Sequence, residues 1–109
     1  MNNYQIDRQR WSRFTIQEQM GNIGSEVGRS IQAWRTHDEE RFNGALYRAL
    51  DLFDATTELL VAKHSPRTKE VLRSKDQFLA LFFDNTFEED SDNIEQYFMQ
   101  YALAARRDR

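Results

Sequence analysis

The chain has 109 residues, a net charge of −3 and no cysteine. This length predicts one domain with its own core, and the lack of cysteine excludes a disulfide framework and a cysteine-based zinc site. No apolar run reaches the roughly 20 residues that a membrane span requires, and the first residues lack the basic and apolar regions of a signal peptide. We therefore expect a cytoplasmic protein without membrane contact.

Residues 1–14 contain apolar side chains without a sustained period, and we interpret them as an N-terminal arm with one short helical turn. A helical bundle domain of residues 15–109 follows. Thr15 and Glu18 match a capping box, which predicts the start of a first long helix. Its apolar side chains recur at helical spacing, at Ile16, Met20, Ile23, Val27, Ile31 and Trp34. The arm either covers its own bundle or reaches a neighbouring subunit.

Three of the four glycines of the chain, Gly21, Gly24 and Gly28, fall within this first helix. Each glycine in a helix interior costs about 1 kcal/mol relative to alanine. The three positions lie close together beside the apolar stripe, so they leave a bare strip that another backbone or a ligand can approach. We predict close helix packing at this strip, with a ligand groove as the alternative.

Two further helices are separated by a clear boundary signal. The second begins near Asp38 and extends to about Lys63. Ser65 and Pro66 match an N-cap serine followed by proline at the first helical position, which predicts the start of the third helix. We expect that helix to end at Asp84.

A fourth helix follows Thr86, which forms a second capping-box pattern with Glu89; Ser91 or Asp92 offers an alternative cap. The connections between the four helices are short, which is typical of antiparallel neighbours. The sequence therefore predicts an all-α fold, an up-down antiparallel four-helix bundle with a short N-terminal arm.

Asp51, Asp54 and Glu58 share one face of the second helix, a pattern typical of magnesium ligands in all-α nucleotide pyrophosphohydrolases. This face points away from the expected core, whereas metal sites in bundles project inward. We interpret the three acids as solvent-exposed, with Asp51 paired to Arg48. His37 and His64 fall in loops without a metal-ligand pattern. We therefore predict no catalytic, cofactor-binding or metal residue and no enzyme, and keep a metal-dependent pyrophosphohydrolase as an alternative.

Apolar side chains outside the core face predict an interface. Leu52 and Leu59 form a second face on the second helix, and Met99 and Leu103 do so on the fourth. Because one bundle needs only one apolar face per helix, we expect these residues, with Trp11 of the arm, to contribute to self-association or to binding of a protein partner.

Basic residues gather in the third helix, and more lie at the C-terminus from Arg106 to Arg109. Clustered cations can contact the phosphates of a nucleic acid, although the acidic chain as a whole weakens this interpretation. The candidate nucleic-acid contacts in the third helix are Arg67, Lys69, Arg73 and Lys75.

The stretch from Glu26 to Trp34 (EVGRSIQAW) resembles a signature helix of the accessory variability proteins of diversity-generating retroelements. These are relatives of the four-helix proteins encoded in 23S ribosomal RNA intervening sequences. The resemblance implies a non-enzymatic cyclic oligomer that serves a reverse transcriptase and its RNA. The positions of this sequence that we match to the family's signature helix are Gly28, Arg29 and Trp34. The resemblance adds Arg29 to the candidate nucleic-acid contacts.

Together these patterns favour a non-catalytic helical interaction module, a homo-oligomeric adaptor that docks a protein partner. The alternative from another class is an RNA-binding accessory protein of a reverse transcriptase.

Overall fold

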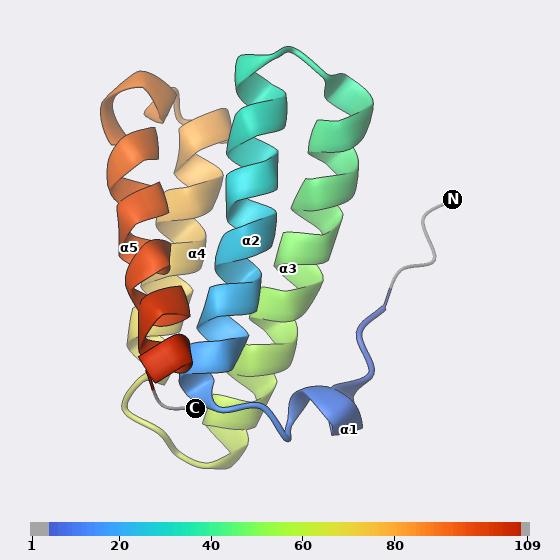
Figure 1. The fold of residues 1–109 in the computed structure, drawn as a ribbon, viewed down its shortest axis with the longest axis vertical. Coiled ribbons are helices and arrows are strands. Elements are labelled where there is room, and N and C mark those ends of the chain that lie inside the picture. The colour runs from blue at the N-terminus through green and yellow to red at the C-terminus, as the bar shows by residue number, and fades with distance from the viewer. Residues whose placement is uncertain (1–4, 108–109) are drawn as a thin grey trace.

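A computed structural model describes residues 5–107, which contain helices and no strand (Figure 1). None of the helices in this range is long and apolar enough to cross a membrane. One helix has four residues and the other four are long. Their bounds are α1 Arg8–Trp11, α2 Ile16–Arg35, α3 Glu39–Ala62, α4 Thr68–Phe83 and α5 Phe87–Arg107.

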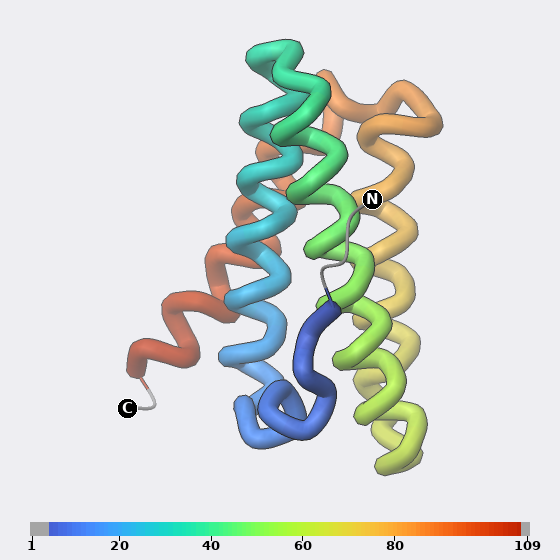
Figure 2. Tube along the Cα trace, turned by 90° about the vertical axis from the view of Figure 1, so that its right-hand side faces the viewer, coloured from blue at the N-terminus to red at the C-terminus, as the bar shows by residue number. Residues whose placement is uncertain are grey.

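The four long helices lie side by side, each packed against two others. Helix α2 contacts α3 and α5, and α4 contacts the same two helices from the other side. Helix α1 contacts α3 at the end where α2 begins. Toward its C-terminus α5 leans away from the other helices (Figure 2), so its last turns have fewer neighbours.

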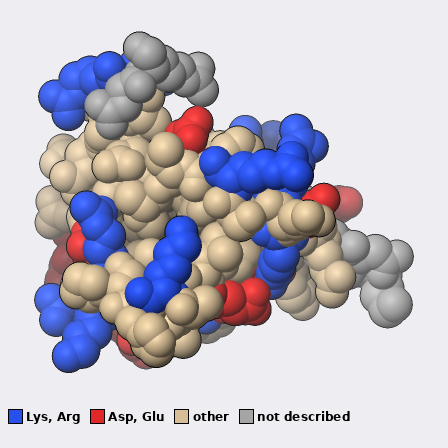
Figure 3. Space-filling view, turned by 90° about the horizontal axis from the view of Figure 1, so that it is seen from below, with Lys and Arg blue, Asp and Glu red and all other residues tan. Residues whose placement is uncertain are grey.

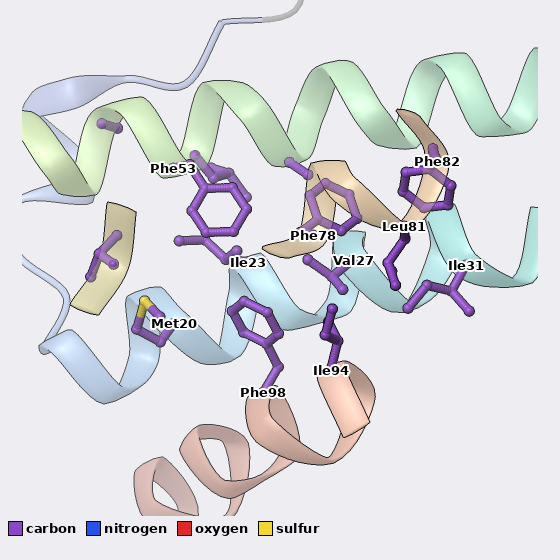
Figure 4. Close-up of a cluster of buried hydrophobic side chains, with 14 of the residues drawn as sticks. Met20, Ile23, Val27, Ile31, Phe53, Phe78, Leu81, Phe82, Ile94 and Phe98 are labelled. Atoms are coloured by element: carbon purple, nitrogen blue, oxygen red, sulfur yellow. The ribbon is translucent and has the colours of Figure 1, made fainter. Parts of the chain in front are cut away.

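The core lies between all four long helices, where α2 and α5 direct apolar side chains toward α3 and α4 (Figure 4). Most core positions of α2 are those of the predicted apolar stripe, whereas Trp34 at its end is 39% exposed. Burying each large side chain contributes about 1.5–3 kcal/mol. The labelled core residues are Met20, Ile23, Val27, Ile31, Phe53, Phe78, Leu81, Phe82, Ile94 and Phe98.

The capping box predicted at the start of α2 is confirmed. The hydroxyl of Thr15 accepts a hydrogen bond from the amide of Glu18 at 3.1 Å, and the Glu18 carboxylate accepts one from the amide of Thr15 at 2.9 Å. Asp38 caps α3 by accepting from the amide of Arg41 at 3.1 Å. These caps satisfy amides that have no partner within the helix.

Of the two later cap predictions, that of Ser65 and Pro66 is wrong, whereas Thr86 directly precedes α5 as predicted but makes no side-chain capping bond in residues 5–107. Ser65 accepts from the amide of Arg67, but α4 begins at Thr68, so Pro66 lies in a turn before the helix. The hydroxyl of Thr86 is buried without a hydrogen-bond partner in residues 5–107, so it does not cap α5.

Helix α5 already begins at Phe87, which places the alternative caps Ser91 and Asp92 inside it. Phe87 is buried and its ring lies 6.0 Å from that of Phe82. The helix thus begins directly after Thr86, as the sequence predicts, and the buried ring of Phe87 anchors its first turn on α4.

Candidate interaction surfaces

The arm packs on its own bundle at α3. The Asp51 carboxylate accepts hydrogen bonds from the amide of Ile6 at 2.6 Å and from the guanidinium of Arg8 at 2.8 Å. Glu58 contacts the same guanidinium at 3.3 Å. The hydrogen bond to Asp51 is the main reason that the pKa of Arg8 is raised. Residues 5–14 therefore cover one face of the bundle; Tyr4, which the sequence assigned to the arm, lies outside the described residues.

Trp11 is buried under this arm, with 2% of its surface exposed. Leu52 is 4% exposed, and Leu59 is half-buried against the core. The prediction of an interface at Trp11 and Leu52 is therefore wrong, because the arm and the bundle cover these side chains within one chain. The arm lies against α3, and Leu59 packs against the core.

The acidic triad of α3 is divided between two basic partners. Asp51 and Glu58 bind Arg8, and Asp54 pairs with Lys75 of α4 at 3.0 Å. The predicted pair of Arg48 with Asp51 is wrong, since Arg48 binds Glu26 of α2. Residues 5–107 hold no group of three or more histidine, cysteine or acidic side chains arranged to bind a metal ion.

Both histidines are exposed and lie just after a helix. His37 and His64 have positive φ angles of 57° and 53°, so each adopts the left-handed conformation that reverses the chain. The amides after them, of Asp38 and Ser65, bind the carbonyls of Ala33 and Leu60 at 2.9 Å. This hydrogen-bond pattern is that of a Schellman motif, which assigns the histidines a backbone role.

The glycine strip packs closely at two of its three positions. A Cβ atom added to Gly24 would lie 2.7 Å from the Cβ of Phe98, and one added to Gly21 would lie 3.4 Å from the Cα of Ala102. Close packing of α2 against α5 is thus confirmed at these glycines. The prediction of close packing is wrong for Gly28, because a Cβ atom added there would meet nothing within 4 Å.

Two apolar side chains of α5 remain on the surface: Met99 is 57% exposed and Leu103 is 50% exposed. They lie one helical turn apart on α5. Exposed acids precede them along α5, and the exposed Arg106 and Arg107 follow them. This surface agrees with the predicted apolar face of the fourth helix.

Basic side chains gather in separate groups at the end of the molecule where α3 and α5 end and α4 begins (Figure 3). Arg67 and Lys69, at the start of α4, are exposed, and so is Arg73. Lys75 is held by Asp54, and Arg29 by Glu26. Of the C-terminal cluster, Asp108 and Arg109 lie outside the described residues.

A buried carboxylate that the sequence did not reveal lies between α2 and α3. The side chain of Glu26 is 7% exposed and accepts hydrogen bonds from both Arg29 and Arg48. Its position beside the apolar stripe and Arg29 three residues later were local signals, whereas Arg48 is 22 residues away. Two guanidiniums are thereby fixed on the outer surface of these helices.

A second polar cluster joins α4 to α5. The hydroxyl of Tyr97 donates to the carboxylate of Glu70 at 2.8 Å, and Tyr101 donates to the same oxygen. The bond from Tyr101, followed by that from Tyr97, lowers the pKa of Glu70. Burial is the main reason that the pKa values of both tyrosines are raised.

No family model, curated protein or solved structure matches this chain. The resemblance to accessory variability proteins therefore stays a prediction.

Proposed function

We propose that this protein is a non-catalytic helical interaction module that self-associates through α5 and docks a protein partner. In this proposal the long helices form an up-down antiparallel four-helix bundle, and the protein acts in the cytoplasm. The observation that carries the proposal is the exposed pair Met99 and Leu103, flanked by acids on one side and by arginine on the other.

The outer stripe of α5 is complementary to itself. Asp92, Met99 and Arg106 are spaced by seven residues, so they project from one side of the helix. If a second copy packs antiparallel with its two-fold axis at Met99, Arg106 of each copy lies beside Asp92 of the other. At 1.5 Å per residue, both charges are about 10 Å from that axis. An isologous contact of this kind is the usual form of a symmetric dimer.

The charges at the acidic end of the stripe remain available to such a contact. Arg35 binds Asp92 at 3.0 Å and Glu95 at 3.2 Å, so one cation serves two carboxylates. The side chain of Asp92 is still 84% exposed. A net negative charge at this end therefore supports the pairing with Arg106.

The contact has a modest expected strength. Met99 and Leu103 are already about half-buried, so covering the rest contributes roughly half of the 1.5–3 kcal/mol of a fully exposed side chain. Association costs at least about 4 kcal/mol in lost translational and rotational freedom. We therefore expect dimers that form with rising protein concentration.

Exposed aromatic side chains away from the stripe of α5 support docking of another protein. Phe83, the last residue of α4, is 67% exposed, and Trp34, near the end of α2, is 39% exposed. The exposed acids Asp84 and Glu88 lie beside the end of α4 and the start of α5. This combination suits a partner segment with apolar and basic side chains.

The non-catalytic part of the proposal is supported by the ion pairs. The three acids of α3 bind Arg8 and Lys75, and His37 and His64 adopt the backbone conformation of helix ends. In residues 5–107 these groups therefore serve the fold.

Sedimentation equilibrium over a range of concentrations tests the self-association. We expect Leu103→Glu to shift the protein to monomer, whereas Leu72→Glu, at a leucine of α4 that is 41% exposed, leaves association unchanged. Arg106→Asp should weaken the dimer, and combining it with Asp92→Arg should restore it. A wild-type protein that is monomeric at all concentrations contradicts the proposal.

The basic end of the molecule supports a second candidate function, an RNA-binding accessory protein of a reverse transcriptase. Arg67, just before α4, is exposed, and so are Lys69 and Arg73 on that helix. Phosphate contacts of this kind release counterions, so binding weakens steeply with salt. RNA titrations at several salt concentrations test this candidate: Lys69→Ala should reduce both the affinity and the salt dependence. The absence of RNA binding at low salt contradicts it.

A further inference from the structure

A groove follows the outer surface of α2 and α3. One part has a volume of about 1160 Å³ and extends past Gly44 and Tyr47; the other, of about 620 Å³, extends along the arm. Arg29 and Arg48 line both parts, so their guanidiniums lie where the two meet.

The buried Glu26 carboxylate holds these two guanidiniums. It accepts hydrogen bonds from the Nη1 atom of Arg29 and the Nε atom of Arg48. A guanidinium has five N–H donors, and within residues 5–107 each arginine uses one of them in this contact. The site thus combines two positive charges with one negative charge, and further donors are free to bind an anion.

Gly44 keeps space beside one of the guanidiniums. A Cβ atom added there would lie 3.2 Å from the Nη1 atom of Arg48. Glycine in the interior of α3 costs about 1 kcal/mol relative to alanine. The space that Gly44 leaves for the Arg48 side chain is a structural reason for a glycine at this helical position.

We propose that the groove binds a phosphate monoester, with its phosphate on Arg29 and Arg48. Fixed guanidinium pairs match the oxygen geometry of phosphate, and the groove has room for an organic group next to it. The ring of Tyr47, which is 60% exposed on the lining, offers a flat surface for an aromatic base. This site is separate from the self-association stripe of α5.

Isothermal titration calorimetry with adenosine monophosphate, inorganic phosphate and adenosine tests the proposal. We expect adenosine monophosphate to bind more tightly than inorganic phosphate, and adenosine to show no binding. Tyr47→Ala should reduce the affinity for the nucleotide to that for phosphate. No binding of either phosphate compound, or equal binding of adenosine, overturns the proposal.

Three variants test the arginine site itself. Arg48→Lys keeps the charge that faces Glu26 but loses the additional donors, so nucleotide affinity should fall at least about tenfold. Gly44→Ala should weaken binding by crowding Arg48, while its thermal unfolding shows that the fold is kept. The matched control Gly28→Ala, on α2, should bind as the wild type does. Unchanged binding in both Arg48→Lys and Gly44→Ala refutes this placement of the phosphate.

Discussion

The indole nitrogen of Trp11 donates a hydrogen bond to the hydroxyl of Thr56, 2.9 Å away, and both side chains are buried. Thr56 donates in turn to Gln19 at 3.0 Å. The side-chain Nε2 atom of Gln19 donates to the backbone carbonyls of Trp11 and Phe14, each at 3.1 Å. The arm is therefore tied to α2 and α3 by a buried network, and the loss of one member leaves others without partners.

Replacing Thr56 with valine should lower the free energy of unfolding by about 2 kcal/mol, because a buried polar group without a partner costs about 1–3 kcal/mol. Chemical denaturation measures this loss. Thr57→Val is the matched control: the Thr57 hydroxyl is buried without a partner in residues 5–107. We expect that control to be neutral or stabilising. Equal losses in the two variants would contradict the role of the network.

Alanine at two positions of the glycine strip should have opposite effects. Gly24→Ala places a Cβ atom 2.7 Å from that of Phe98 and forces α2 and α5 apart. We expect a loss of about 1–3 kcal/mol. Gly28→Ala meets no atom within 4 Å and should gain up to about 1 kcal/mol from helix propensity. Thermal unfolding of both variants measures the difference, and destabilisation by Gly28→Ala would refute this account.

Glycine at His37 or His64 should stabilise the protein. Both residues have positive φ angles, a conformation that costs a non-glycine residue about 1–2 kcal/mol. Because glycine also has more freedom in the unfolded chain, the expected net gain is about 0.5–1 kcal/mol for each variant. Denaturant unfolding measures it. If His64→Gly is instead less stable, the imidazole has a role beyond the backbone.

The Glu70 cluster predicts how stability changes with pH. The pKa of Glu70 is lowered from 4.5, so its contribution is present above pH 4.5 and is lost as the pH falls through the folded-state value. The pKa values of Tyr97 and Tyr101 are raised from 10.0. Their contribution is present below pH 10.0 and is lost as the pH rises through their folded-state values.

Unfolding of wild type and Tyr97→Phe across this pH range tests the prediction. The variant should lose about 1 kcal/mol at neutral pH, since it lacks one hydrogen bond to a partly exposed carboxylate. It should also lose less stability above pH 10.0 than the wild type does. If the free energies of unfolding of the two proteins change in parallel with pH, the ionisation of Tyr97 is not linked to folding.

The sequence by itself determined the helices and much of the core, because these depend on side chains within one or two turns of each other. The stripe from Met20 to Ile31 and the capping box of Thr15 are such local patterns. The exposed Met99 and Leu103 also follow from periodicity, since the core face of α5 is already occupied by Ile94 and Phe98.

Only the tertiary structure decided which distant side chains meet. Trp11 and Thr56 are 45 residues apart, and Glu26 and Arg48 are 22 apart. No local pattern encodes such pairs, because the packing of one helix on another fixes their geometry. The same packing buries Phe87 and leaves the hydroxyl of Thr86 without a hydrogen-bond partner in residues 5–107, although α5 begins directly after Thr86 as predicted. Local side-chain chemistry thus determines that a helix forms and largely where it begins, while the neighbouring helices determine which of its polar groups are buried and with which partners they pair.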